Sequence, residues 1–219
     1  IIIKRMEILP LKNKLVYEPF SKLSISHKNV VNLVPAKNSY IYKYINKNKG
    51  AYEPETMATI CALIEYNCNS FFDIGANIGL YSAIMSTIFQ NKIEIHAFEP
   101  APDLNKIATE IAQLNSINYR CHDIALSDKK GTADFYLSPV TDTSHSLNPD
   151  FRKSKNKISV ELNTLNEFCK EKGCWPDLLK IDTETTEFSV LSGGEKLIEE
   201  KRPWIVCEVL NGGGKEIED

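Results

Sequence analysis

The sequence FDIGANIG at residues 72–79 decides the fold of this 219-residue chain. The apolar run that leads into it, residues 70–74, has the length and composition of a buried strand. Gly75 permits a tight turn and lets a ligand approach the backbone. Apolar side chains then recur at helical spacing, and Gly79 would let that helix pack close to its strand. The stretch therefore predicts a strand, a tight turn and a helix.

The charge before the turn indicates which ligand it suits. A turn that binds a pyrophosphate has the spacing G-x-G-x-x-G, whereas this one is D-x-G-x-x-x-G, with Asp73 before the first glycine. A carboxylate at that place suits a cationic ligand, such as one with an amino group, and disfavours a pyrophosphate. The alternative is an ordinary strand, turn and helix without a ligand.

Outward from this turn, predicted strands alternate with predicted helices. Helices are expected from Pro54, around residues 104–111, and from about Thr185 with an interruption at Gly193-Gly194. Strands are expected at residues 92–98, 118–121, 131–138, 157–162, 177–181 and 204–209. The alternation predicts an α/β fold with a doubly wound, mostly parallel sheet.

The beginning of the chain has a different pattern. Residues 1–50 lack strong helical periodicity, and residues 39–44 have the composition of a strand. We interpret residues 1–50 as an N-terminal extension and residues 51–219 as one domain.

Acidic residues stand at the ends of the predicted strands. They are Asp73, Glu99, Asp123, Asp182 and Glu208. In doubly wound sheets, ligands bind beyond the carboxyl ends of the strands. Glu99 follows Asp73 by 26 residues, and an acid that ends the second strand can accept hydrogen bonds from two ribose hydroxyls. A surface acid at a strand end is the alternative for Glu99.

Composition narrows the classes of partner and the compartment. The net charge of −3 and the pI near 5.9 argue against a protein that binds nucleic acid through broad positive charge. No apolar run approaches the roughly 20 residues that span a bilayer. The six cysteines contain no C-x-x-C pair, so we expect free thiols in a reducing compartment and a cytoplasmic protein.

Several stretches together resemble the FkbM family of methyltransferases, which depend on S-adenosylmethionine (SAM). They are FDIGANIGLYS at 72–82, FEP at 98–100, DIALS at 123–127, the run 161–168 leading into WPD at 175–177, and LKIDTE at 179–184. The similarity covers roughly residues 50–210 in matching order.

The resemblance implies a Rossmann-like fold of the class I methyltransferase type, SAM as methyl donor, and a hydroxyl as acceptor. Family members act on sugars, glycans and natural-product-like small molecules, so we expect such an acceptor. The resemblance implies that Glu99 binds the ribose, and that Asp123 and Ile124 lie near the adenine. It also implies a set of residues around the methionine part of SAM, namely Asp73, Gly75, Ala76, Asn77 and Gly79.

The chain departs from the family pattern after the LKIDTE stretch. The family has small residues there, typically glycine, whereas this sequence has Thr185-Thr186. The chain also ends soon after the last predicted strand, where this fold class adds an antiparallel pair. We therefore expect the domain to be truncated or disordered at its C-terminus.

Three further residues are candidates for chemistry on the acceptor. Asp182 and Glu184 are two residues apart just after a strand, where they would face the same way if the strand geometry continued. They are expected to accept a proton from the acceptor hydroxyl or to contact it. The alternatives are capping of the next helix and a metal site, although our prediction includes no metal. His145, in a polar loop, is the histidine best placed for a general base.

Two other functions compete with methyl transfer. One is a binding module that kept the fold and lost activity, for which Thr185-Thr186 is the only hint. The other is a nicotinamide-dependent oxidoreductase, which the glycine spacing disfavours. The sequence leaves the acceptor's identity and the oligomeric state open.

Overall fold

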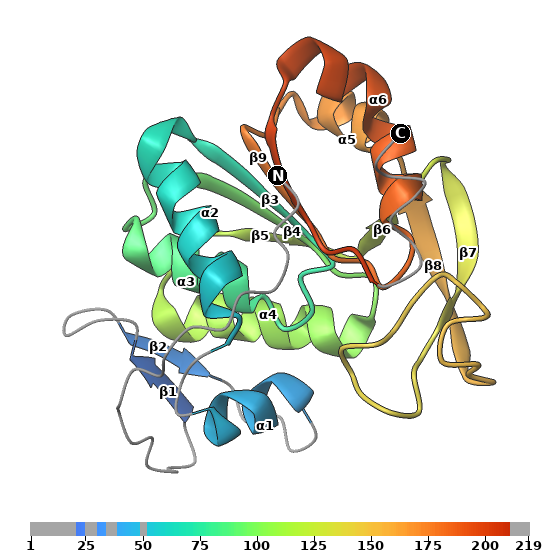
Figure 1. Ribbon diagram of the computed structural model, residues 1–219, viewed down its shortest axis with the longest axis horizontal. Coiled ribbons are helices and arrows are strands. Elements are labelled where there is room, and N and C mark those ends of the chain that lie inside the picture. The colour runs from blue at the N-terminus through green and yellow to red at the C-terminus, as the bar shows by residue number, and fades with distance from the viewer. Residues whose placement is uncertain (1–20, 25–29, 34–38, 49–51, 211–219) are drawn as a thin grey trace.

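The computed structural model describes residues 21–24, 30–33, 39–48 and 52–210 (Figure 1). Its centre is a sheet of five strands in the order β10-β9-β3-β4-β5, and every neighbouring pair is parallel. The strands are β3 (Ser70–Ile74), β4 (Glu94–Phe98), β5 (Arg120–His122), β9 (Leu178–Ile181) and β10 (Trp204–Cys207). The predicted parallel sheet is confirmed.

Helices cover both faces of this sheet. One face carries α2 (Pro54–Asn67), α3 (Leu80–Ile88) and α4 (Pro102–Asn115), and the other carries α5 (Leu165–Lys172) and α6 (Glu187–Lys201) (Figure 1). Successive strand residues point to opposite faces. Phe71 therefore packs in the core beneath the first group of helices, and its neighbour Phe72 packs in the core beneath the second. The predicted doubly wound α/β fold is confirmed.

A smaller sheet lies beside the main one. It consists of β6 (Ile124–Leu126), β8 (Lys157–Asn163) and β7 (Gly131–Tyr136), with β6 parallel and β7 antiparallel to β8. The two predicted strands that flank the polar loop are thus confirmed as β7 and β8. Tyr136 and Ser146 form an isolated bridge, which holds the loop between these strands close to the end of β7.

The strand predicted at residues 39–44 is wrong, because this segment forms the helix α1 (Tyr40–Lys47). Its aromatic and β-branched residues favour a strand in isolation. The buried side chains are Ile41, Tyr42 and Ile45, at helical spacing, and they join the core beneath α2, α3 and α4. Burial of this helical face outweighs the local preference.

The interruption predicted in the last helix is also wrong, because α6 continues through Gly193 and Gly194. Both glycines are sites of close packing. A Cβ atom on Gly193 would lie 2.0 Å from the carbonyl oxygen of Ser127, and one on Gly194 would lie 2.8 Å from Leu165. The contacts that these glycines permit offset their low helical propensity.

The described parts of the predicted N-terminal extension pack against the domain. The strands β1 (Ser21–Ser24) and β2 (Val30–Leu33) form an antiparallel pair, and the backbone N–H of Asn32 donates to Asn115 Oδ1 of α4 at 2.7 Å. The remainder of residues 1–50, the boundary at residues 50–51 and the C-terminal segment 211–219 lie outside the described residues. Division of the chain at residue 50 stays a prediction.

Two predictions from composition can be compared with the structure. All six cysteines are free thiols, as expected. Within the described ranges, no helix has both the length and the apolar character that crossing a membrane requires.

Candidate functional site

The acidic residues at the strand ends meet at one edge of the main sheet. In the order of the strands, they are Glu208, Asp182, Asp73, Glu99 and Asp123. Backbone hydrogen bonds continue just past the strands, since the N–H groups of Asp182 and Glu208 donate to Ile74 and Ile181 at 3.0 and 2.9 Å. This edge is where a doubly wound sheet binds its ligand.

A cavity of about 470 Å³ opens at this edge. It lies among the strand ends, the residues that precede α2, and the loop between β7 and β8. Most of the predicted site residues line it, namely Gly75, Asn77, Glu99, Ile124, His145, Asp182 and Glu184. Other lining residues that matter below are Tyr52, Glu53, Phe98, Pro100, Leu104, Leu126, Arg152 and Glu208.

Four predicted cofactor residues do not line this cavity: Asp73, Ala76, Gly79 and Asp123. Asp73 is fully buried, where it accepts hydrogen bonds from the hydroxyl and the N–H of Ser82 at 2.8 and 3.2 Å. Asp123 is exposed and lines a separate, smaller hollow. The expected contacts of Asp73 with the amino group and of Asp123 with the adenine therefore have no support in the cavity's geometry.

The two glycines of the turn serve close packing between parts of the chain. A Cβ atom on Gly75, which has φ +76°, would lie 1.8 Å from the carbonyl oxygen of Asp182. One on Gly79 would lie 2.9 Å from the Cβ atom of Ala108 in α4. The sequence correctly predicts a tight turn at Gly75, but the nearest crowding group is the backbone that follows β9 rather than a ligand.

Glu99 is held with its carboxylate at the cavity wall. Its Oε2 atom accepts a hydrogen bond from the N–H of Asn77 at 2.9 Å, and its Oε1 atom accepts one from the N–H of Ala101 at 2.8 Å. Burial raises the pKa of Glu99 to about 7, although these two hydrogen bonds act in the opposite direction. Glu99 is therefore fixed in position and changes charge near neutral pH.

Asn77 connects the turn to the loop over the site. Its side-chain N–H donates to the carbonyl oxygen of Asp142 at 2.8 Å, and its Oδ1 atom accepts from the N–H of Ile78 at 2.9 Å. The loop is thus attached to the turn on which the predicted ligand would lie.

His145 lines the cavity, yet its geometry is unfavourable for a general base. Its Nδ1 atom accepts a hydrogen bond from the N–H of Ser138 at 2.9 Å. In the neutral ring, Nε2 then carries the hydrogen and can donate but not take a proton. Burial lowers the pKa of His145, with Asp142 opposing, so the neutral form dominates at neutral pH.

Lys180 is the residue that sequence reasoning missed. Its ammonium lies 3.0 Å from Asp182 Oδ2 and 3.8 Å from Asp73 Oδ1, and its side chain is 4% exposed. Burial would lower its pKa, but attraction by Asp182 and Asp73 raises the pKa on balance. The available signal was a charged residue within an apolar strand, since Lys180 interrupts the run 178–181.

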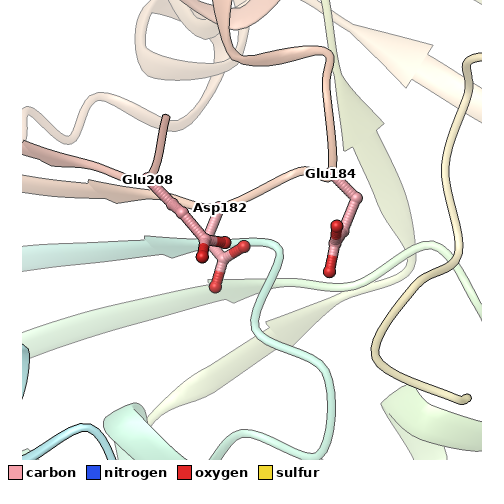
Figure 2. A group of neighbouring side chains, drawn as sticks. All are labelled: Asp182, Glu184 and Glu208. Carbon is pink, nitrogen blue, oxygen red and sulfur yellow. The ribbon is translucent and has the colours of Figure 1, made fainter. Parts of the chain in front are cut away.

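Asp182 and Glu208 form a pair of acids beside this lysine. Figure 2 shows their carboxyl groups next to one another, with Glu184 on the loop that follows β9. Oxygen atoms of the three side chains lie within 4.8 Å of one another. The charge of Asp182, then burial, raises the pKa of Glu208, which therefore holds the proton in the hydrogen bond between the two acids.

After Glu99, Glu184 is the second acid of the cavity with a pKa near neutrality. Burial, then the charge of Asp182, raises the pKa of Glu184 to about 7, while Arg152 opposes the rise. Glu184 does not continue the strand geometry, because its φ is +55°. It still lines the cavity together with Asp182.

A different acid stabilises the turn before α6. Glu187 Oε1 accepts hydrogen bonds from the N–H groups of Thr183 and Thr185 at 2.9 and 3.1 Å. Among the described residues, neither Asp182 nor Glu184 has such a role toward α6, whose N-cap residue is Thr186. The capping alternative for these two acids is therefore disfavoured, and their carboxylates are available to the cavity.

Thr185 has a strained backbone at the place where the family has a small residue. Its φ is +82°, a region that a β-branched residue rarely adopts. We expect Thr185→Gly to raise the free energy of unfolding by about 1 kcal/mol, because relief of strain outweighs the extra entropy of glycine in the unfolded chain. Urea unfolding of the two proteins measures the difference. Equal or lower stability of the glycine variant would contradict the strain.

Comparison with known proteins addresses the family directly. A family model described as Methyltransferase FkbM domain matches residues 73–217. A search of curated proteins gave no match.

Among solved structures, methyltransferase FkbM from Methylobacillus flagellatus KT is similar, with a TM-score of 0.50 and 15% sequence identity. The match covers 67% of this chain and 34% of that one, so the present chain spans about a third of its length. At this identity the similarity concerns the fold alone, and it agrees with the parallel sheet and its covering helices. The family match includes the glycine turn, Glu99 and the Asp182 loop, and the chain belongs to the FkbM methyltransferase family.

Proposed function

We propose that this protein is a SAM-dependent methyltransferase whose acceptor is a hydroxyl on a sugar, a glycan or a natural-product-like small molecule. The observation that carries the proposal is the position of Glu99, which lines the cavity beside the glycine turn with both carboxylate oxygens anchored by backbone amides. Each oxygen keeps a second lone pair for a ribose hydroxyl.

The remaining wall of the cavity fits the other parts of SAM. Its volume of about 470 Å³ lies within the range of small-molecule sites. Near Glu99 the lining is apolar and suits the adenine, with Phe98, Pro100, Leu104, Ile124 and Leu126. On the other side, the carboxylates of Glu53 and Asp182 suit the positive sulfonium and amino groups. The same acids disfavour a pyrophosphate, and hence the nicotinamide alternative.

When bound, SAM supplies an electrophilic methyl group, which the acceptor oxygen takes while the electron pair of the carbon–sulfur bond stays on sulfur. The protein's own task is to orient the acceptor and remove its proton. Asp182 is the proposed proton acceptor, because it is the ionised member of its pair, and Glu184 is proposed to orient the hydroxyl. The role of base proposed for His145 from sequence is the weaker choice, since its Nδ1 atom is already occupied.

Isothermal titration with SAM, with its demethylated product and with NAD tests the proposal. We expect both sulfur compounds to bind and NAD to give no heat. Binding of NAD alone would favour the oxidoreductase. Binding of SAM without turnover on any panel of hydroxylated acceptors would favour the inactive module, toward which the strained Thr185 points.

The affinity for SAM should depend on pH through Glu99. Its ionised form accepts both ribose hydroxyls, whereas the protonated form loses an acceptor site. Because its pKa is about 7 in the free protein, a proton must leave before binding at lower pH. The dissociation constant should therefore rise about tenfold for each pH unit below 7 and level off above it. Titration calorimetry between pH 5.5 and pH 8.5 measures this change.

Glu99→Gln is the matched control, because the amide keeps the shape and removes the titration. We expect it to bind SAM about ten- to a hundredfold more weakly at pH 8, since charge-assisted hydrogen bonds are lost. Its affinity should also lose most of the dependence on pH. If the Gln variant binds as tightly as the parent, Glu99 is not the ribose ligand.

A further inference from the structure

We propose that Lys180 is the positioning residue of this site, whose buried ammonium holds the Asp182 carboxylate in place and in its charged form at the cavity wall. This inference rests on the proposed function in one respect only, namely that the charged Asp182 takes the proton of an acceptor hydroxyl. It concerns a residue without an assigned role, and one that need not touch either substrate.

The register of the sheet brings Lys180 to this place. Lys180 on β9 is the direct partner of Asp73 on β3, so their side chains leave the same face of neighbouring strands. Asp182 follows Lys180 by two residues and lies on that face as well. The Lys180 ammonium consequently lies 3.0 Å from Asp182 and 3.8 Å from Asp73. The lysine connects the strand before the glycine turn to the acid at the cavity.

The lysine is fixed from a third side by α3. Its ammonium lies 4.9 Å from the centre of the Tyr81 ring, a cation–π contact. The hydroxyl of Tyr81 in turn donates to Glu53 Oε2 at 2.5 Å. The Lys180 side chain is 4% exposed and is held by Asp73, Asp182 and this ring. It therefore has little freedom to move.

Acids and phenols surround the Lys180 ammonium. The titratable groups that face Lys180 and Asp182 include Asp73 on β3, Glu99 after β4, Cys207 and Glu208 at the end of β10, Glu184 after β9, Tyr81 on α3, and Tyr52 and Glu53 before α2. Acids this close cannot all be ionised without a counter-charge. Because the ammonium bonds Asp182 rather than Glu208, it decides which member of that pair is charged.

This choice has a chemical consequence. An acceptor hydroxyl gives its proton only to a carboxylate that is not already protonated. With Lys180 present, the free lone pairs of Asp182 take that proton, which later leaves to water, and Glu208 keeps its own. Without Lys180, the proton shared by the acids would reside on Asp182 for more of the time.

The test follows the carboxyl group of Asp182 in the free protein, by carbon NMR of a sample labelled at the aspartate carboxyl carbons. Asp182→Asn identifies the signal. We expect Lys180→Met to raise the pH at which Asp182 titrates by at least one unit, since a contacting opposite charge lowers a carboxyl pKa by about 1–3 units. The acidic limb of the kcat profile should move upward by a similar amount.

Two variants separate this role from general support of the fold. Lys196→Met removes an exposed lysine of α6, whose side chain is 78% exposed, and should leave the Asp182 signal unchanged. Lys180→Met combined with Asp73→Asn removes one buried charge of each sign and so keeps the buried charge balanced. This double variant is the one to measure if the single variant does not fold. In the double variant we still expect Asp182 to titrate at least one unit higher.

An unchanged titration of Asp182 in a folded variant without Lys180, single or double, would overturn the proposal. So would a return of the normal titration in the double variant, because Lys180 would then only balance Asp73. The NMR measurement needs no SAM. If SAM fails to bind while the Asp182 shift appears, the proposed function is wrong and the role of Lys180 stands.

Discussion

Gly75→Ala is expected to lower the free energy of unfolding by more than about 3 kcal/mol, a large part of the roughly 5–15 kcal/mol that stabilises an ordinary protein. A Cβ atom at this position would lie 1.8 Å from the carbonyl oxygen of Asp182. The clash is with the backbone that directly follows the neighbouring strand β9, so no side-chain rotation relieves it. Separation of β3 from β9 is the remaining relief, and it would break the sheet at the site.

Gly173→Ala is the matched control for this variant. Gly173 also has positive φ, +66°, but a Cβ atom there would meet nothing within 4 Å. It should cost about 1 kcal/mol, which is the cost of the left-handed conformation alone. Circular dichroism during thermal and urea unfolding measures both variants. Equal losses at Gly75 and Gly173 would mean that the turn and the Asp182 loop are less closely packed than the structure shows.

The parts of the fold that could be predicted are those in which local pattern and packing agree. The stretch 70–79 has a short apolar run followed by glycines, and it forms β3 and its turn. The predictions failed where tertiary contacts outweigh local preference. Residues 39–44 have strand-like residues but bury a helical face, and Gly193 weakens a helix locally yet allows its contact with Ser127.

The candidate site also combines features that follow from local sequence with features that depend on tertiary contacts. A strand end places an acid at the edge of the sheet, and Glu99 and Asp182, which follow strands, both line the cavity. Local sequence does not determine which acids face the cavity and which face the interior, because that depends on partners distant in sequence. Asp73 faces Lys180, which is 107 residues away along the chain, and only the register of β3 with β9 brings the two together.

Asp182→Asn is expected to reduce turnover by about a hundredfold or more, because a general base contributes about 10² to 10⁴ to the rate. The amide keeps the shape of the side chain but cannot take the proton of the acceptor hydroxyl. Lys180 retains Asp73 as a partner at 3.8 Å, so the variant should fold. Its affinity for SAM should fall far less than turnover, since Glu99, Glu53 and the apolar wall are untouched. Steady-state kinetics together with titration calorimetry separate the two effects.

Asp134→Asn provides the control for this substitution, because Asp134 is a surface residue of β7 that pairs with Lys157, and its loss should leave turnover unchanged.

A second experiment tests whether the acids act without a metal. Lys180 already places a positive charge 3.0 Å from Asp182, so we expect EDTA to leave the parent active and Mg²⁺ not to rescue the variant. Activity that is lost to EDTA and restored by a divalent ion would contradict a metal-free site. Full turnover in a folded Asp182→Asn protein would exclude Asp182 as the base, and Glu184, the nearest acid on the same loop, would then be the group to test.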